Sequence, residues 1–327
     1  MFTLFISETS LAKVPGLSAA GANLEALPYT APADADMLFY DRPRVVDCVP
    51  LDPFGHPTPA IVTRAAVLEG GFPVRAVRVG NTIAPAAPFE DVTDVPGGDP
   101  RLGPSVANTE LIRAAAEKLA RGTDERLQVV AESVPGGTTT ALLLLRALGY
   151  EGTVSSAGPV NPLSLKEEIW RGVAQRLDIG VGGLRGRGLE AAAEVGDPMQ
   201  IAAASYVAAL PEDDEVVLAG GTQMLAVAAL LRDMGVKRDL LVATTKYVAN
   251  DKTSCFDRYA REIGVRTYAA PLDFSHSRFK GLADYEHGFI KEGVGMGGAV
   301  WYAVRNGRSV EAVVKRTEAL YENMVEA

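Results

Sequence analysis

The sequence has few of the residues that cross-link chains or bind metals. Only two cysteines, Cys48 and Cys255, occur in 327 residues, and they are far apart and form no CxxC pair. This argues against a disulfide scaffold and a cysteine-based zinc site, and it favours reduced thiols in the cytoplasm. The three histidines form neither an HExxH motif nor a His-rich tract. We therefore expect no catalytic metal.

Long apolar runs and an excess of positive charge are also missing. No run of about 18 uncharged apolar residues occurs, and the first eight residues contain no basic group, so we expect no membrane span and no signal peptide. Acidic residues outnumber basic ones by 41 to 32, which gives a net charge of −9. This argues against broad binding to nucleic acid or to an anionic membrane, but local donors can still hold an anionic substrate.

Short apolar segments alternate with helical patterns in most of the chain. This is the βαβ pattern, and it predicts an α/β fold with a doubly wound, Rossmann-like, mostly parallel sheet between helices. The predicted strands beyond residue 104 are 127–131, 153–156, 215–219, 240–244 and 266–270. The predicted helices are 105–121, 138–148, 163–177, 198–210, 222–234, 255–263, 297–305 and 310–325.

The first part of the chain is more irregular. It contains candidate strands at 3–7, 45–49, 60–68 and 74–79, followed by a Pro- and Gly-rich loop over 83–104. We predict an N-terminal strand and loop region (1–104) that packs on an α/β nucleotide-binding core (105–308), then a C-terminal helix (309–327). The two chain ends would form a smaller subdomain.

Ligands of such sheets bind beyond the carboxyl ends of the strands, so the turns that follow strands are the first candidates for a site. The turn 132–140 contains Gly136, Gly137, Thr138 and Thr139 at the start of a helix, where free N–H groups can hold a phosphate. No lysine follows Gly137, so this is no Walker loop. A tight glycine turn capped by threonines is the alternative interpretation.

A second turn repeats this arrangement with Gly220, Gly221 and Thr222 after the strand 215–219. Its alternative is close packing of a helix on its strand. Because both turns follow strands of one sheet, we expect them to face the same crevice.

Two other loops contain polar or basic residues. The segment 180–188 contains five glycines with Arg185 and Arg187, and it is either a mobile anion-binding loop or a flexible surface loop. The segment 273–278 contains Ser275 and His276, but no GxSxG elbow exists, so a hydrolase triad is not indicated. We predict that Ser275 and His276 hydrogen-bond to a ligand or orient its phosphate, with a capped loop as the alternative.

A third glycine-rich loop follows Glu292. Gly293, Gly295 and Gly298 fit GxGxxG formally, but no clear strand precedes them and under 30 residues follow. We therefore reject a dinucleotide site here, and an NAD-linked oxidoreductase, which would bind NADH tightly, stays the third and least favoured hypothesis. A carboxylate in a partly apolar cleft can have a raised pKa and serve as a general base, whereas a solvated Glu292 would simply pair with a neighbouring cation.

Five segments, taken together and in order, resemble the nicotinate-nucleotide:dimethylbenzimidazole phosphoribosyltransferase family, especially its divergent branch common in archaea. They are 132–139, 196–204, 219–221, 275–278 and 292–295. The first differs from the bacterial pattern E-M-G-I-G-N-T-T by Pro135 and an extra residue, and the third lacks the family's Asp. The segments 14–21 and 29–35 resemble the opening of the archaeal-type branch.

This resemblance implies a cytoplasmic enzyme that transfers the phosphoribosyl group of nicotinate mononucleotide to an azole or purine base, with release of nicotinate, during assembly of the cobamide lower ligand. It implies Glu292 as the general base, and it also implies a homodimer. We expect no cofactor, because no acidic pair that would hold Mg²⁺ ends a predicted strand. A non-catalytic nucleotide-binding protein of the same fold is the alternative. The predicted substrate-binding residues are Glu132, Gly136, Gly137, Thr138, Thr139, Gly220, Gly221, Thr222, Ser275, His276, Gly293 and Gly295.

Overall fold

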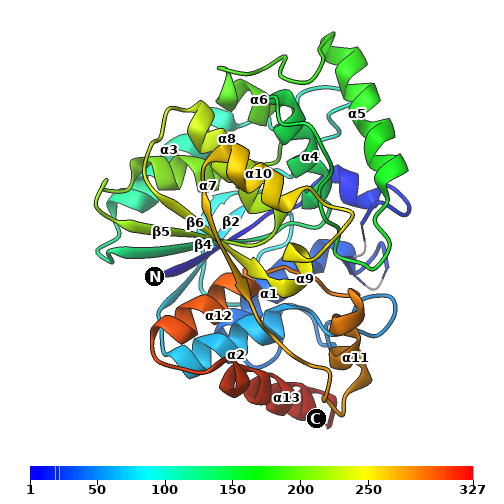
Figure 1. The fold of residues 1–327 in the computed structure, drawn as a ribbon, viewed down its shortest axis with the longest axis vertical. Coiled ribbons are helices and arrows are strands. Elements are labelled where there is room, and N and C mark those ends of the chain that lie inside the picture. The colour runs from blue at the N-terminus through cyan, green and yellow to red at the C-terminus, as the bar shows by residue number, and fades with distance from the viewer. Residues whose placement is uncertain (19, 22, 327) are drawn as a thin grey trace.

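A single parallel sheet runs through the molecule (Figure 1). The computed structural model describes residues 1–18, 20, 21 and 23–326. The strands lie in the order β3-β2-β1-β4-β5-β6-β7, and every neighbouring pair is parallel. They are β1 (Phe2–Ile6), β2 (Val74–Val79), β3 (Glu90–Thr93), β4 (Leu127–Ser133), β5 (Glu215–Ala219), β6 (Leu240–Thr245) and β7 (Arg266–Ala270). The strand order reverses between β1 and β4, so the α/β class and the double winding are confirmed.

Both faces of the sheet are buried, which explains why its strands are nearly continuous apolar runs. Leu218 and Val242 pack into one hydrophobic core, whereas Val217 and Ala243 pack into the core on the other face. One face is covered by the helices in the upper part of Figure 1. These are α3 (Thr109–Arg121), α4 (Gly137–Ala147), α6 (Gly188–Val195), α7 (Pro198–Ala209), α8 (Thr222–Asp233) and α10 (Phe256–Ile263).

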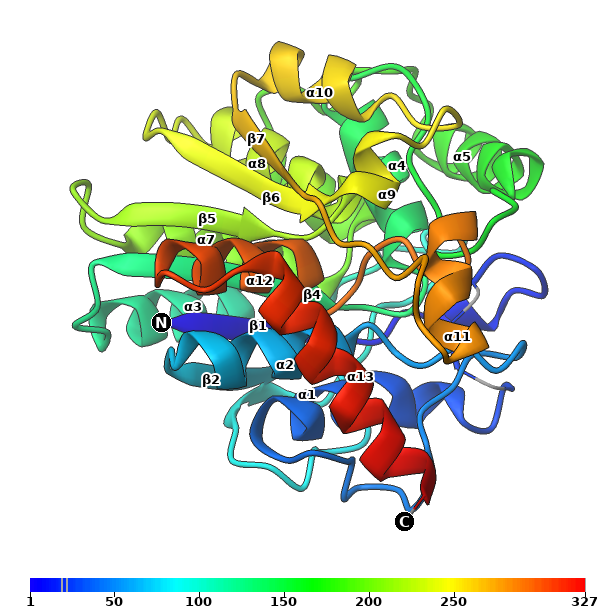
Figure 2. The ribbon, with the colours of Figure 1, turned by 60° about the horizontal axis from the view of Figure 1, so that its bottom comes forward.

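Helices from the two chain ends pack together on the other face (Figure 2). They are α1 (Thr30–Phe39), α2 (Ala60–Gly70), α12 (Met296–Arg305) and α13 (Val310–Glu326). The glycines at the start of α12 allow this helix to approach the sheet closely. A Cβ atom on Gly298 would lie 2.2 Å from Cβ of Ala219, and one on Gly297 would lie 2.1 Å from the carbonyl carbon of Thr244.

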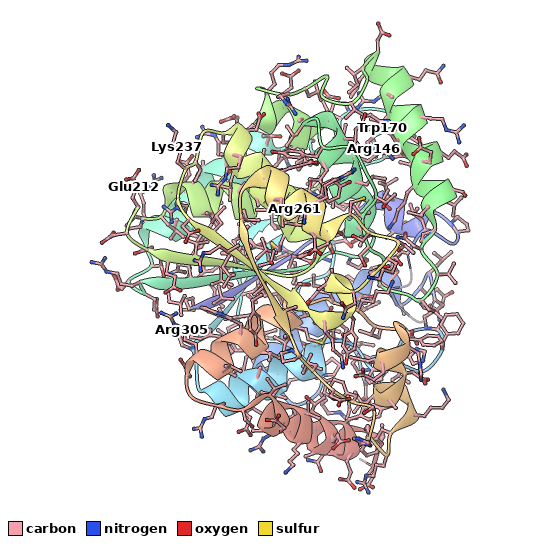
Figure 3. The ribbon with its side chains drawn as sticks, in the orientation of Figure 1. Arg146, Trp170, Glu212, Lys237, Arg261 and Arg305 are labelled. Atoms are coloured by element: carbon pink, nitrogen blue, oxygen red, sulfur yellow. The ribbon has the colours of Figure 1, made fainter. Side chains whose placement is uncertain are left out.

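The helix α5 (Leu163–Leu177) lies at the edge of the molecule beside α4. The guanidinium of Arg146 donates to Glu167 at 2.7 Å and lies 5.6 Å from the ring centroid of Trp170 (Figure 3). The remaining helical segments are η1 (Ser10–Lys13), η2 (Leu27–Tyr29), α9 (Lys246–Ala249), α11 (Lys280–Ala283) and η3 (Asp284–His287). No helix in the described residues is long and apolar enough to cross a membrane.

Several predicted elements were wrong. Residues 60–68 form the helix α2, because burial against α12 and α13 outweighs the strand preference of Ile61, Val62 and Thr63. Residues 45–49 and 153–156, both within the described chain, form no strand. The short strand β3 lies inside the expected loop 83–104, and the helices α1 and α6 were not predicted. The helix α3 begins at Thr109 instead of residue 105.

Residues 1–104 contribute three of the seven strands, so the N-terminal region is part of the central sheet. The division of the chain at residues 104 and 308 stays a prediction.

Candidate functional site

A cavity of about 290 Å³ opens beyond the carboxyl ends of the central strands. Its walls come from the turns after β4 and β5, from the residues before α12, and from N-terminal residues between 16 and 59. This is the edge of the sheet, near the reversal of strand order, where ligands of doubly wound folds bind. The turn residues that line it include 132–138 and 221–223, and the approach to α12 contributes 290–294.

Two glutamates from different elements meet at this cavity. Glu292 accepts hydrogen bonds from the backbone N–H groups of Gly293 and Gly297, both at 3.2 Å, and from the hydroxyl of Thr244 at 3.2 Å. Burial raises the pKa of Glu292 to about 7, although these donors act in the opposite direction. Glu292 is therefore divided between its ionised and protonated forms near neutral pH.

Glu132 ends β4 and is held from the neighbouring turn. The side-chain amide of Gln223 donates to its Oε2 atom at 2.8 Å. Burial, reinforced by the negative charge of Glu292, raises the pKa of Glu132 well above its usual value. Because two nearby carboxylates cannot both ionise cheaply, the charge of Glu292 favours the protonated form of Glu132.

Glycines allow the turn at Gly136 and Gly137 to pack closely. Gly136 has a φ of 82°, and a Cβ atom there would lie 2.9 Å from the amide nitrogen of Ala12. A Cβ atom on Gly137 would lie 2.3 Å from Nε2 of Gln223, the group that holds Glu132. The glycines thus allow the start of α4 to reach both the N-terminal segment and the turn after β5.

A third carboxylate, Asp34 of α1, lines the cavity and is almost completely buried. The hydroxyl of Thr58 donates to its Oδ1 atom at 2.7 Å, and the hydroxyl of Ser133 donates to its Oδ2 atom at 2.7 Å. Burial raises the pKa of Asp34 to about 6.

Two buried lysines lie near one another, and one of them lines the cavity. Lys291, which lines the cavity, pairs with Asp251 at 2.8 Å. Lys166 donates to the carbonyl oxygen of Ser155 at 2.9 Å and to Oδ1 of Asn161 at 3.0 Å. Burial, together with the charge of Lys291, lowers the pKa of Lys166 to about 7. Lys291 thus brings a cationic group to this wall, with Asp251 as its partner.

Comparison with known proteins assigns the chain to a family, although no protein-family model matches it. It is 47% identical over 332 residues to UPF0284 protein PF0303 of Pyrococcus furiosus, covering 99% of each chain. A UPF0284 protein of Thermococcus onnurineus is 47% identical over 333 residues, covering 100% of this chain and 98% of the relative. The chain belongs to the UPF0284 family.

Two solved structures share the UPF0284 fold. One is a nicotinate-nucleotide-dimethylbenzimidazole phosphoribosyltransferase from Thermus thermophilus, with a TM-score of 0.63 and 18% identity over 98% of this chain and 82% of that one. The other, CobT from the same organism, has a TM-score of 0.61 and 18% identity over 98% and 83% of the two chains. The resemblance inferred from the motifs is thus confirmed in the fold, and the UPF0284 relatives are archaeal, as expected of the divergent branch.

Most of the predicted site residues of this UPF0284 chain lie at or directly behind the cavity. Those that line it are Glu132, Gly136, Gly137, Thr138, Gly221, Thr222, Glu292 and Gly293. Thr139 is buried in α4, and Gly220 packs beside Glu132, where a Cβ atom would lie 3.4 Å from Oε1. Gly295 packs against Ala131 of the sheet, where a Cβ atom on the glycine would lie 2.5 Å from Cβ of Ala131.

The structure does not bring Ser275 and His276 to this cavity. Both side chains are exposed, and the following Arg278 pairs with Glu322 of α13. The physical reason is that β7 is the last strand of the sheet, and the chain leaves it to pack across the C-terminal helix. Their predicted part in substrate binding stays a prediction.

The basic residues of the glycine-rich loop 180–188 also lie elsewhere. Arg185 donates to the carbonyl oxygen of Leu148 at 3.1 Å, beyond the end of α4, and Arg187 pairs with Glu190 at 3.0 Å. The loop therefore packs on α4, and its arginines have protein partners.

The N-terminal segments of the family resemblance contribute to the cavity wall. Gly16, Leu17, Ser18, Ala20 and Gly21 line it, whereas Ala19 of the same motif lies outside the described residues.

Sequence analysis missed Asp34 and Lys166, although one of the two had a local signal. Lys166 shares a helix face with the buried residues Ile169, Trp170 and Val173, at the spacing of an apolar stripe. A lysine in such a stripe is unusual enough to indicate a function. Asp34 lies in the segment 29–35 that resembles the family, but no role was expected of it, because its partners Thr58 and Ser133 are distant in the sequence.

Proposed function

We propose that this protein transfers the phosphoribosyl group of nicotinate mononucleotide to a nitrogenous base and releases nicotinate, in assembly of the cobamide lower ligand. The observation that carries the proposal is Glu292, a buried carboxylate with a pKa of about 7 that lines a cavity together with Lys291 and the start of α4. The cobamide context comes from the structural neighbours, whose names specify transfer to dimethylbenzimidazole.

In this proposal Glu292 takes the proton of the attacking base. The lone pair of the base's ring nitrogen forms a bond to C1′ of the ribose, while the bond from C1′ to nicotinate breaks and its electron pair stays on nicotinate. The ring proton passes to the Glu292 carboxylate. A pKa near 7 suits this role because enough of the group is ionised at neutral pH while it remains basic enough to accept a proton.

Glu132 supports the same step through its protonation state. Its raised pKa favours the protonated form, in which it contributes no second negative charge beside Glu292. It can then donate a hydrogen bond to a ribose oxygen.

We place the phosphate of the nucleotide between the start of α4 and Lys291. Helix N-termini attract phosphate, and Thr138 adds a hydroxyl at that end of the cavity. Lys291 supplies charge, while Lys166 holds the Ser155 backbone that forms part of the wall. The net charge of −9 makes such local cations necessary for binding an anionic substrate.

The test is incubation of the protein with nicotinate mononucleotide and a panel of azoles and purines, with nicotinate and nucleotide products measured by mass spectrometry. Coupled release of nicotinate and formation of a base-ribose phosphate support the proposal. Binding of nicotinate mononucleotide without release would favour the non-catalytic nucleotide-binding protein instead.

The general-base role has its own test. Glu292→Gln keeps the size and polarity of the side chain but cannot accept the proton, so turnover should fall by about 10²–10⁴ while nucleotide affinity is retained. A base that binds as its anion at high pH should partly rescue the variant. Near-normal turnover of Glu292→Gln would show that another carboxylate is the general base, and Glu132 would be the first one to test.

A further inference from the structure

Asp34 has an environment that its protein partners do not complete. It receives two side-chain hydroxyl donors, from Thr58 and Ser133, and within the described residues no lysine, arginine or histidine forms an ion pair with it. Each carboxylate oxygen therefore keeps a lone pair that no donor of the described chain uses. With a pKa of about 6, the group is mostly ionised at neutral pH. A buried charge without a cation is costly unless donors satisfy it.

The neighbouring Asp36 shows how the same helix satisfies a purely structural carboxylate. Its Oδ2 atom accepts the backbone N–H groups of Arg44 and Val45 at 2.8 and 2.7 Å, and its Oδ1 atom accepts that of Ala87 at 2.7 Å. Asp36 is absent from the cavity wall, whereas Asp34 is part of it. The difference indicates that a ligand supplies the donors that Asp34 lacks.

The cavity that Asp34 lines also has apolar residues that suit a flat heteroaromatic ring. Val46, Val49, Leu51 and Pro59 line the same cavity and are apolar. Pro59 lies against the Glu292 loop so closely that a Cβ atom on Gly293 would be 2.7 Å from its Cγ atom. The apolar wall thus connects Asp34 with the proposed base Glu292.

The charge of Asp34 determines which part of the substrates it can meet. The carboxylate of nicotinate and the phosphate would both be repelled, and the unused lone pairs of Asp34 need a group with an N–H or O–H donor. Ribose hydroxyls and the incoming base both meet that requirement, and the adjacent apolar wall favours the base.

We propose that the acceptor is a heteroaromatic base with an N–H or O–H donor besides its reacting ring nitrogen, and that Asp34 selects it by accepting that hydrogen bond. This rests on the proposed phosphoribosyl transfer. It names the class of acceptor: amino- or hydroxy-substituted azoles and aminopurines are preferred over bases that carry only methyl groups.

The sharpest test compares hydroxybenzimidazole with methylbenzimidazole, which have nearly the same shape and differ in one donor. We expect kcat/KM for the hydroxyl-bearing base to be roughly 10- to 100-fold higher, because the analogue that lacks the donor leaves a buried charge unpaired. Asp34→Asn should reduce this preference several-fold, since a neutral acceptor makes a weaker bond than an ionised one. Asp197→Asn, the same change at a buried carboxylate outside the cavity wall, should leave the preference unchanged.

Calorimetry separates this inference from the proposed function. If no base releases nicotinate, the transferase proposal fails, but tighter binding of hydroxybenzimidazole than of methylbenzimidazole would still support the role of Asp34. Equal kcat/KM and equal affinity for the two bases would overturn it, and this comparison needs only the wild-type protein. Loss of nicotinate mononucleotide affinity in Asp34→Asn, with an unchanged preference between bases, would assign Asp34 to the ribose and also overturn it.

Discussion

The N-terminus of α7 and the cavity wall at α1 each bury a carboxylate, and they satisfy it in different ways. Burial raises the pKa of both Asp197 and Asp34 to about 6. Asp197 caps α7: its Oδ1 atom accepts the backbone N–H of Gln200 at 3.0 Å, the Gln200 side chain accepts the Asp197 N–H at 3.2 Å, and the Thr140 hydroxyl also donates to Asp197. Within the described residues Asp34 has two hydroxyl donors, from Thr58 and Ser133, and it lies at the cavity.

The comparison teaches that burial alone does not distinguish a structural carboxylate from a functional one. The two carboxylates differ in which groups donate hydrogen bonds to their oxygen atoms. The oxygen atoms of Asp197 accept hydrogen bonds from α7 and α4, so removal of this side chain should lower the stability of the fold. Asp34 has acceptor positions that face the cavity, so removal of this side chain should mainly weaken ligand binding.

The largest expected effect on folding is at Asp197. Asp197→Ala removes a helix cap and leaves the Thr140 hydroxyl and the Gln200 N–H without their partner, so the free energy of unfolding should fall by about 2–4 kcal/mol. Asp34→Ala should cost less, because its two hydroxyl partners can turn towards water in the cavity. Urea unfolding followed by circular dichroism measures both. Equal losses of unfolding free energy in the two variants would contradict the distinction between a structural and a ligand-binding carboxylate.

The buried carboxylates also predict how the free energy of unfolding depends on pH. The pKa values of Asp34, Asp197 and Glu292 are raised on folding from 3.8, 3.8 and 4.5 to about 6, 6 and 7. The folded state therefore binds these protons more tightly, and their stabilising contribution is complete below about pH 4 and is lost as the pH rises to about 7. Each unit of pKa shift corresponds to about 1.4 kcal/mol.

We therefore expect the free energy of unfolding to decline between about pH 4 and about pH 7, and to decline less in Asp34→Asn. Urea unfolding at several pH values checks this. The lowered pKa of Lys166, about 7, acts with the opposite sign but only above that range. A rise in the free energy of unfolding between about pH 4 and about pH 7 would contradict the raised pKa values of these carboxylates.

The role of Lys291 in phosphate binding can be tested by removing its charge. Lys291→Gln keeps a donor for Asp251 but removes the charge beside the proposed phosphate, so affinity for nicotinate mononucleotide should fall by about tenfold. Nicotinate riboside, which lacks the phosphate, is the matched control and should bind equally to both proteins. Calorimetry measures both ligands, and an equal loss for both would place the phosphate elsewhere.

The smallest expected effect separates two adjacent threonines. Thr138 lines the cavity, whereas Thr139 is buried in α4 and its hydroxyl has no partner among the described residues. Thr138→Val should weaken nucleotide binding by about 0.5–1.5 kcal/mol, and Thr139→Val should leave the affinity unchanged. The reverse order would show that the hydroxyl of Thr139 turns towards the ligand.

The sequence by itself determined the α/β class and the main location of the candidate site. Strands β4 to β7 were readable because parallel strands buried on both faces are short apolar runs, and the longer helices between them were predicted as well, although α6 and α9 were not. Glu132 and Gly221 could be expected to meet because they lie at or just beyond the carboxyl ends of the neighbouring strands β4 and β5, at one edge of the sheet. Local pattern and chain order are sufficient for such inferences.

Tertiary structure decided what depends on contacts between distant segments. The helix α2 has a strand-like sequence and is helical because α12 and α13 bury it. Asp34 reaches the cavity only because α1 packs beside the ends of β1 and β4, and Ser275 misses it because the chain after β7 turns towards α13. The free energy of these placements comes from burial between segments far apart in the chain, which no local pattern records.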